Sequence, residues 1–316
     1  SLTTATRTAQ RDAGQNHFER TSIDSVAGVY VQNDQGRLVL QAGRDMNLTA
    51  ATVVNQGKDS LTQLSAGRDM TLSTVTTSAQ DNITWDKNNR LSQGVTQSTL
   101  AGNGDVTLTA GRDMTSQAAS LSAQKGLALM AGHDVTLTGA QNTSSLDEYH
   151  KVTGSSGMLS KTTTTTHDVT DRRTMTGSEL NGDTVSIGAG HNLNVTGSSV
   201  AGDNSVSLAA GNNLSIGTLT ESNRETHLKQ EKKSGLMSSG GVGFSVGSQS
   251  LKVTDAATDT TQKGSTVGSV HGDVSLQAGN RLTVNGSDLI AGRDMALSGK
   301  EVSITAATDQ HVQTHT

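Results

Sequence analysis

The stretch LTAGRDMTSQAASLSAQKGLALMAGHDVTL, residues 108–137, contains one phrase twice: Leu, any residue, Ala, Gly, a basic residue, Asp, an apolar residue and Thr. The glycines of the two copies, Gly111 and Gly132, are 21 residues apart. A phrase that returns at a fixed period of about 20–50 residues is typical of a solenoid, in which each repeat stacks on the one before it. The same phrase should therefore recur along the rest of the chain.

The phrase does return, and it returns in pairs. Within a pair the glycines are 20–24 residues apart, and the first glycines of successive pairs are 68, 79 and 89 residues apart. The predicted repeat glycines are Gly43, Gly67, Gly111, Gly132, Gly190, Gly211, Gly279 and Gly299. A short repeat of about twenty residues is thus combined with a longer one that contains two copies of it.

The apolar residues of each phrase alternate with Thr, Ser and Asn, as in Val135 and Leu137. A period of two indicates a strand with one buried face, and the runs end after four or five residues at Gly, Asn or Asp, which suit turns. These features predict an all-β fold, a parallel β-helix of about ten turns and about 45–50 Å of rod. Five residues should point inward at equivalent positions: Leu108, Leu129, Ile187, Leu208 and Leu276.

The composition agrees with a thin coil and excludes several classes of function. Only 32% of the 316 residues are hydrophobic and 2% aromatic, and there is no proline, which would remove a donor from a strand. The net charge of −5 gives no basic footprint for a nucleic-acid partner. The absence of cysteine excludes disulfides and thiolate metal ligands, and no apolar run is long enough for a membrane-spanning helix.

Polar segments interrupt the coil at residues 77–99, 142–178 and 218–268, each after the second turn of a pair. Interruptions at one phase of the coil should project from one side, and these are too long for simple loops, so we expect hairpin-like arms. Residues 1–21 are interpreted as the tail of a preceding arm, and the remainder of residues 22–316 as β-helix. The chain opens without a signal peptide and closes within a repeat, which suggests an interior piece of a larger protein.

Several short motifs resemble sites but have simpler explanations. Gly-Arg-Asp occurs four times, and we expect its Asp to cap the corner by accepting nearby backbone N–H groups, with the Arg solvated beside it. The segment from Gly102 to Asp105 resembles half of a calcium-binding nonapeptide, but it occurs once, whereas such sites need successive copies. His133 and His191 replace Arg at the repeat corner, and the pair His311 and His315 is expected in a frayed chain end. No metal or cofactor is predicted.

Ser245, between Gly243 and Gly247, matches the nucleophile motif Gly-x-Ser-x-Gly of hydrolases. That motif needs a strand, a sharp turn and a helix, whereas this serine lies in a Gly/Ser tract with strand-like alternation. We interpret the match as chance and predict no catalytic residue.

Tandem L-x-A-G-R-D-M repeats, interrupted by Thr/Ser-rich and GG-x-G-x-S-x-G arms, resemble the filamentous haemagglutinin family over nearly the whole chain. The interrupted type looks most like the second repeat region of contact-dependent growth inhibition exoproteins. The resemblance implies a right-handed parallel β-helix in a long rod, exported to the surface of a Gram-negative cell by two-partner secretion. In the inhibition branch, such rods carry a C-terminal toxin, and this region is thought to help it through the target cell's outer membrane.

The leading hypothesis is therefore a non-enzymatic rod segment, with the rest of the exoprotein, its secretion transporter and a target-cell outer membrane as partners. One alternative is a passive adhesin stalk. Another is a β-helical polysaccharide enzyme, which the five scattered aromatic residues disfavour, because sugar platforms use aromatic rings.

The longest arm contains the candidate membrane contacts Val242, Phe244 and Val246, which alternate with glycine and serine. Lysines nearby could meet anionic head groups. A flexible, solvated hairpin is the competing interpretation. The sharper hypothesis is that several arms pair edge to edge, so that their backbone groups are satisfied as a bilayer requires.

Overall fold

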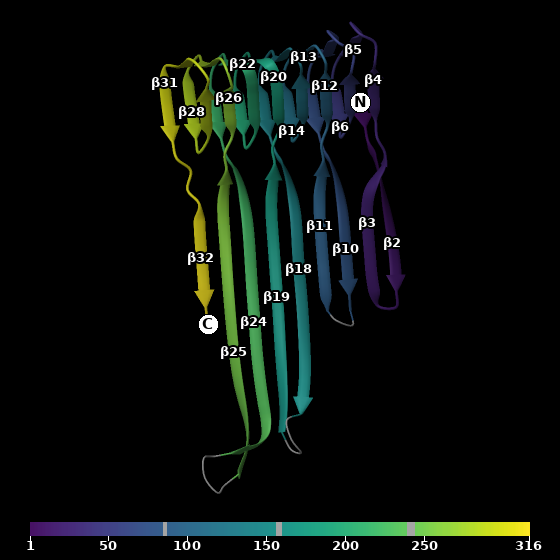
Figure 1. Cartoon of the computed structure of the whole chain (residues 1–316), viewed down its shortest axis with the longest axis vertical. Coiled ribbons are helices and arrows are strands. Elements are labelled where there is room, and N and C mark those ends of the chain that lie inside the picture. Colours follow the sequence, from purple (N-terminus) through teal and green to yellow (C-terminus); the bar gives the residue numbers. More distant parts are fainter. Residues whose placement is uncertain (85–86, 156–159, 239–243) are drawn as a thin grey trace.

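A computed structural model describes residues 1–84, 87–155, 160–238 and 244–316; at 236–238, 244 and 245 it describes the backbone alone. The described residues form strands in three sheets (Figure 1). Two parallel sheets wrap around a common core and form a β-helix, which confirms the predicted fold class. The third sheet is antiparallel and extends from one side of the coil.

The first parallel sheet contributes one short strand to each turn of the coil. Its strands, in spatial order, are β1 (Leu2–Thr3), β6 (Met46–Thr49), β9 (Met70–Ser73), β14 (Met114–Gln117), β17 (Val135–Thr138), β21 (Leu193–Thr196), β23 (Leu214–Gly217), β28 (Arg281–Asn285) and β31 (Glu301–Thr305). Nine strands at about 4.8 Å spacing span about 38 Å.

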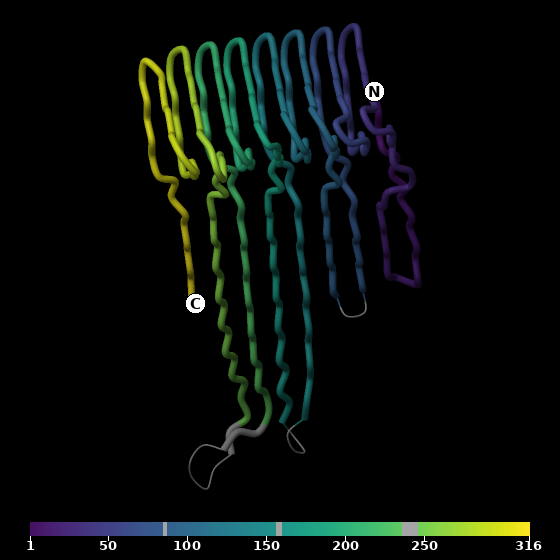
Figure 2. Tube along the Cα trace, turned by 45° about the horizontal axis from the view of Figure 1, so that its top comes forward, coloured from purple at the N-terminus to yellow at the C-terminus, as the bar shows by residue number. Residues whose placement is uncertain are grey.

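The second parallel sheet has 14 strands and supplies the other sides of each turn. Its strands are β4 (Gly28–Val31), β5 (Arg37–Ala42), β7 (Thr52–Asn55), β8 (Leu61–Ala66), β12 (Thr99–Gly102), β13 (Asp105–Ala110), β15 (Ser120–Ala123), β16 (Gly126–Ala131), β20 (Glu179–Ala189), β22 (Ser199–Ala210), β26 (Thr266–Ser269), β27 (Asp273–Ala278), β29 (Asp288–Ala291) and β30 (Met295–Ser298). Figure 2 shows the resulting loops stacked along the rod.

The five residues predicted to point inward form one column inside the coil. Register pairs join Leu108 to Leu129, Leu129 to Ile187, and so on through Leu208 to Leu276. Each has 0–1% of its surface exposed. Each fully buried aliphatic side chain contributes roughly 1.5–3 kcal/mol, so the stacked columns account for the stability of a coil that has almost no aromatic core.

The antiparallel sheet, here called the arm sheet, consists of hairpins joined side by side. Its strands, in order, are β2 (Ala5–Ala13), β3 (Asn16–Ser25), β10 (Val75–Ile83), β11 (Asn88–Thr96), β18 (Ala140–Ser155), β19 (Ser160–Thr176), β24 (Leu219–Ser238), β25 (Phe244–Lys263) and β32 (Gln310–His315). Each hairpin leaves the coil after one of the short strands β1, β9, β17 and β23 and returns to a strand of the second sheet.

Four expectations need correction. The coil has nine turns instead of about ten, because residues 5–25 and 310–315 lie in the arm sheet and not in the coil. Residues 1–21 were interpreted as the tail of a preceding arm, but they contain β2 and most of β3, which pair with each other as one hairpin. Residues 266–268, expected in the third arm, belong to the coil strand β26, where Val267 is fully buried. The chain end is not frayed, because β32 pairs with β25.

Candidate functional site

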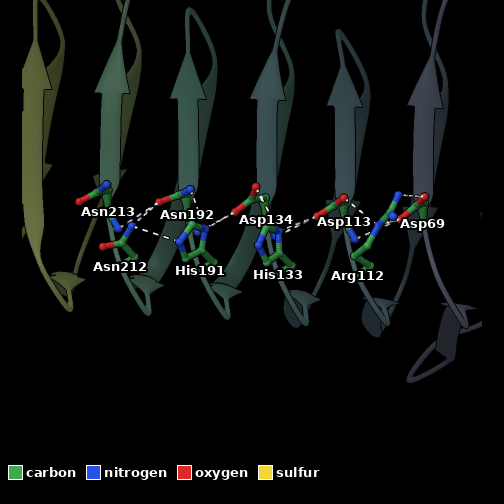
Figure 3. Close-up of polar contacts among 9 residues, drawn as sticks. All are labelled: Asp69, Arg112, Asp113, His133, Asp134, His191, Asn192, Asn212 and Asn213. Atoms are coloured by element: carbon green, nitrogen blue, oxygen red, sulfur yellow. Dashed lines mark hydrogen bonds and ion pairs between the residues drawn. The ribbon is translucent and has the colours of Figure 1, made fainter.

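A column of polar side chains runs along the outside of the coil at the Gly-basic-Asp corner (Figure 3). The Arg112 guanidinium donates to both carboxylate oxygens of Asp69, one turn earlier, at 2.9 and 2.6 Å. Arg68 binds Asp45 in the same way, and its hydrogen bonds hold the pKa of Asp45 below its usual value. The Arg side chain is therefore tied to the neighbouring turn, not simply solvated as the sequence suggested.

The Asp of the phrase also acts between turns. The backbone N–H of Asp134 donates to Asp113 Oδ1 at 3.2 Å, and that of Asn192 donates to Asp134 Oδ1 at 2.9 Å. The expected local cap is thus replaced by an axial ladder, in which each acidic or amide side chain accepts from the next turn. Asn192 and Asn213 continue the ladder because an amide oxygen accepts as a carboxylate does.

The repeat glycines form a second column beside this ladder. A Cβ atom on Gly132 would lie 2.3 Å from the backbone oxygen of Gly111, and the same close approach recurs at Gly67, Gly111, Gly190, Gly211 and Gly279. Gly43, in the first turn, has nothing within 4 Å of that position. Gly299 does not make this close approach: a Cβ atom there would have the Asn280 backbone oxygen, at 3.4 Å, as a neighbour in the preceding turn, and no atom of Gly279 among its three nearest.

A buried serine closes three of the hairpins, β10–β11, β18–β19 and β24–β25, at their return to the coil, and the sequence analysis did not predict it. The Ser98 hydroxyl lies 3.0 Å from Leu48 O and 2.8 Å from Ser73 O, and it accepts the Ala51 N–H. Ser178 and Ser265 make equivalent contacts. The signal in the sequence was a serine within the last four residues of each polar interruption, before the next apolar strand.

The far end of the two longest hairpins is strongly basic. We define the distal arm region by sequence as residues 151–165 and 229–253, whose first and last residues form the register pairs Lys151–Thr165 and Lys229–Val253. It contains six lysines and one glutamate, a net charge of +5, in a chain whose net charge is −5. The lysines, all exposed, are Lys151, Lys161, Lys229, Lys232, Lys233 and Lys252. In Figure 1 these hairpins extend well past β10–β11.

Exposed aliphatic side chains accompany these lysines. Val152, Val246 and Leu251 are 67%, 85% and 62% exposed. Of the candidate membrane contacts, Val246 is thus freely accessible, Phe244 lies in β25 with only its backbone described, and Val242 lies outside the described residues. In the described part of the chain, no helix has the length and apolar character to cross a membrane.

The motifs that resembled catalytic or calcium sites lie in strands and turns of the three sheets. Ser245 lies in β25, whose strand continues to Lys263, so the helix that a hydrolase nucleophile requires does not follow it. Asp105 Oδ1 accepts the Gly126 N–H at 2.9 Å, one turn on. His311 and His315 face Asp259 and Asp255 across the pair β25–β32 and contact them directly.

The hemagglutinin repeat family matches residues 13–154 and 159–316, nearly the whole chain. The chain belongs to this family. The resemblance drawn from the L-x-A-G-R-D-M phrases is therefore confirmed, and relatives of this hemagglutinin repeat segment are CdiA proteins of contact-dependent inhibition.

Three relatives illustrate the match. A deoxyribonuclease CdiA of Dickeya dadantii is 36% identical over 99% of the chain and 9% of its own length. A tRNA nuclease CdiA-2 of Burkholderia pseudomallei is 31% identical over 93% of the chain and 10% of its own length. A 16S rRNA endonuclease CdiA of Enterobacter cloacae subsp. cloacae is 40% identical over 68% of the chain and 6% of its own length.

The hemagglutinin repeat segment therefore spans a tenth or less of the length of these relatives. The nuclease activities in their names describe those whole proteins. No solved structure matches the chain.

Proposed function

We propose that this chain is a non-enzymatic rod segment of a secreted exoprotein on the surface of a Gram-negative cell, exported by a two-partner secretion transporter. In this proposal its arms bring the distal region into contact with the outer membrane of a target cell during toxin delivery. The segment's partners are the rest of the exoprotein and that membrane. The CdiA relatives support the setting, and the charge of the distal arm region supports the membrane contact.

The observation that carries the proposal is the combination of exposed lysines and exposed aliphatic side chains at the far end of the longest hairpins. Each lysine near an anionic membrane surface contributes roughly 1 kcal/mol, and aliphatic groups beside it add apolar contact. The two faces of the arms nearer the coil carry mainly Thr, Ser and paired charges, so the contact is assigned to the distal region alone.

The test is flotation of the purified chain with vesicles that contain anionic phospholipid, and with neutral vesicles as reference. Replacing Lys229, Lys232 and Lys233 by Gln should lower the affinity for anionic vesicles on the order of a hundredfold, from about 1 kcal/mol per lysine. The matched control replaces Arg37, Lys58 and Lys300 by Gln, three exposed cations of the coil, and should bind as the parent does.

Equal binding by the two triple variants, or no binding by the parent, would remove the membrane role. The chain would then be a passive stalk that holds other parts of the exoprotein away from the cell. A non-enzymatic role is tested separately: Ser245→Ala should leave folding unchanged, and loss of a measurable hydrolase activity in that variant would contradict this part of the proposal.

A further inference from the structure

Two imidazole rings meet on the outside of the coil where successive turns both carry histidine at the basic position of the repeat. The His133 and His191 rings stack with centroids 4.7 Å apart and planes 16° apart. Other turns have Arg or Asn at this position, at residues 44, 68, 112, 212 and 280. The axial ladder therefore offers two neighbouring ring nitrogens at one place (Figure 3).

The carboxylate of Asp134 lies between these nitrogens. His133 Nδ1 is 3.2 Å from Asp134 Oδ2, and His191 Nδ1 is 3.2 Å from Asp134 Oδ1. The three ligand atoms lie within 4.8 Å of one another, and no other described part of the chain holds a comparable group of three. We propose that His133, Asp134 and His191 form a binding site for a divalent transition-metal ion of the Zn²⁺ type.

The spacing suits such an ion. Zinc bonds of about 2.0–2.1 Å in tetrahedral geometry place neighbouring ligand atoms roughly 3.3 Å apart, close to both Nδ1–Oδ distances. The two imidazoles need only rotate toward each other to complete the set, and their exposed side chains leave room for this and for water ligands. Asp113 Oδ1, 3.1 Å from His133 Nδ1, is available beside them.

The surrounding hydrogen bonds also position the carboxylate. The backbone N–H of Asn192 donates to Asp134 Oδ1 at 2.9 Å, which holds the carboxylate beside both imidazole rings. His191 Nδ1 also lies 2.8 Å from the Asn192 side-chain amide nitrogen, and a metal ion bound at Nδ1 would replace that contact. Imidazole nitrogens select zinc, copper or nickel over calcium and magnesium, which prefer all-oxygen sites.

The test is titration of the whole chain, purified without a histidine tag, with ZnCl₂ by calorimetry, together with thermal unfolding with and without the metal. We expect one Zn²⁺ per chain and a higher unfolding temperature. His133→Arg introduces the side chain that the repeat carries at Arg112, and His191→Asn introduces that of Asn212. Both keep the ladder but remove one ligand, and each should weaken binding by more than about tenfold, the loss that even an outer-shell partner causes.

The control is His271→Asn, which removes an exposed histidine that contacts a single carboxylate, Asp203, at 2.7 Å. It should bind Zn²⁺ as the parent does. Equal binding by the parent, His133→Arg and His191→Asn, or no binding by the parent, overturns the site. Far-ultraviolet circular dichroism verifies that each variant is folded. If His133→Arg does not fold, the binding measured for His191→Asn decides the test.

Discussion

At the scale of single residues, stability depends on which face of a strand a side chain occupies. Leu129 is fully buried in β16 between Leu108 and Ile187, whereas its neighbour Met130 is 55% exposed. Leu129→Asp would bury a charge without a partner and should destabilise the coil by several kcal/mol. Met130→Asp adds the same charge on the outer face and should change stability little. Denaturant unfolding of both variants checks this, and similar losses would contradict the inward column.

The repeat glycines are required by the neighbouring turn and not by a special backbone angle. Gly132→Ala would place a methyl group against the backbone oxygen of Gly111, and overpacking of this kind typically costs about 1–3 kcal/mol. Gly43→Ala occupies the same place in the repeat with no turn beneath it, so it should be tolerated. The unfolding temperatures of the two variants check this. Equal destabilisation of both would contradict the explanation from stacked turns.

Each of the nine histidines lies within ion-pair distance of a carboxylate, although their positions in the sequence are scattered. For His227, the hydrogen bond to Asp168 is the main cause that raises the pKa of the ring above its ordinary value. A raised pKa means that the pair stabilises the arm fully below about pH 6.5 and that this contribution is lost as pH rises through the folded-state pKa.

We therefore expect amide hydrogen exchange in β19 and β24, corrected for the intrinsic rate, to be slower at pH 6 than at pH 8. His227→Gln should reduce that difference. A histidine pKa at or below the free value in an NMR titration would show that the pair has no such effect.

At the scale of elements, the hairpins join because their width matches the advance of the coil. A hairpin occupies two strand spacings, about 9.6 Å, and two turns of the coil also advance about 9.6 Å. Because a hairpin leaves the coil after every second turn, β11 meets β18 and β19 meets β24 at ordinary strand separation. An isolated two-stranded ribbon would be marginally stable, so this match explains why the arms are ordered strands.

Shortening the longest hairpin should separate the coil from the arms. Residues 226–256 can be replaced by Asn-Gly, which closes the pair Glu225–Ala257 with a two-residue turn and leaves β26 intact. The coil should keep its unfolding temperature, because its buried columns are unchanged, while vesicle flotation should fall. A large loss of coil stability would mean that the arm sheet, and not the aliphatic interior, holds the turns together.

At the scale of the whole molecule, charge is separated along the arms: the distal region is positive and the remainder negative. Attraction of the distal region to anionic vesicles should weaken as salt shortens the screening length from about 10 Å at 0.1 M to about 3 Å at 1 M. Flotation at increasing NaCl should therefore show a steep loss. Binding that is unchanged by salt would assign the contact to the aliphatic groups instead.

The sequence by itself determined the coil. A phrase that recurs every 20–24 residues, with apolar residues at alternate positions, can bury its side chains only by stacking turn on turn, so Leu108, Leu129 and Ile187 were placed correctly. It also predicted interruptions at one phase of the coil, because the loss of the repeat period is visible without any structure.

Only the tertiary structure decided how the interruptions behave and what the corners do. Polar strands such as β19, with its run of threonines, carry no one-sided apolar pattern, so their partners follow from the geometry of the coil that brings them together. In the same way, the contact of Asp134 with His191 joins residues of two turns that are 57 positions apart in the sequence. The local sequence determines which side chain stands at each position of a turn. The stacking of one turn on the next determines which side chains come into contact.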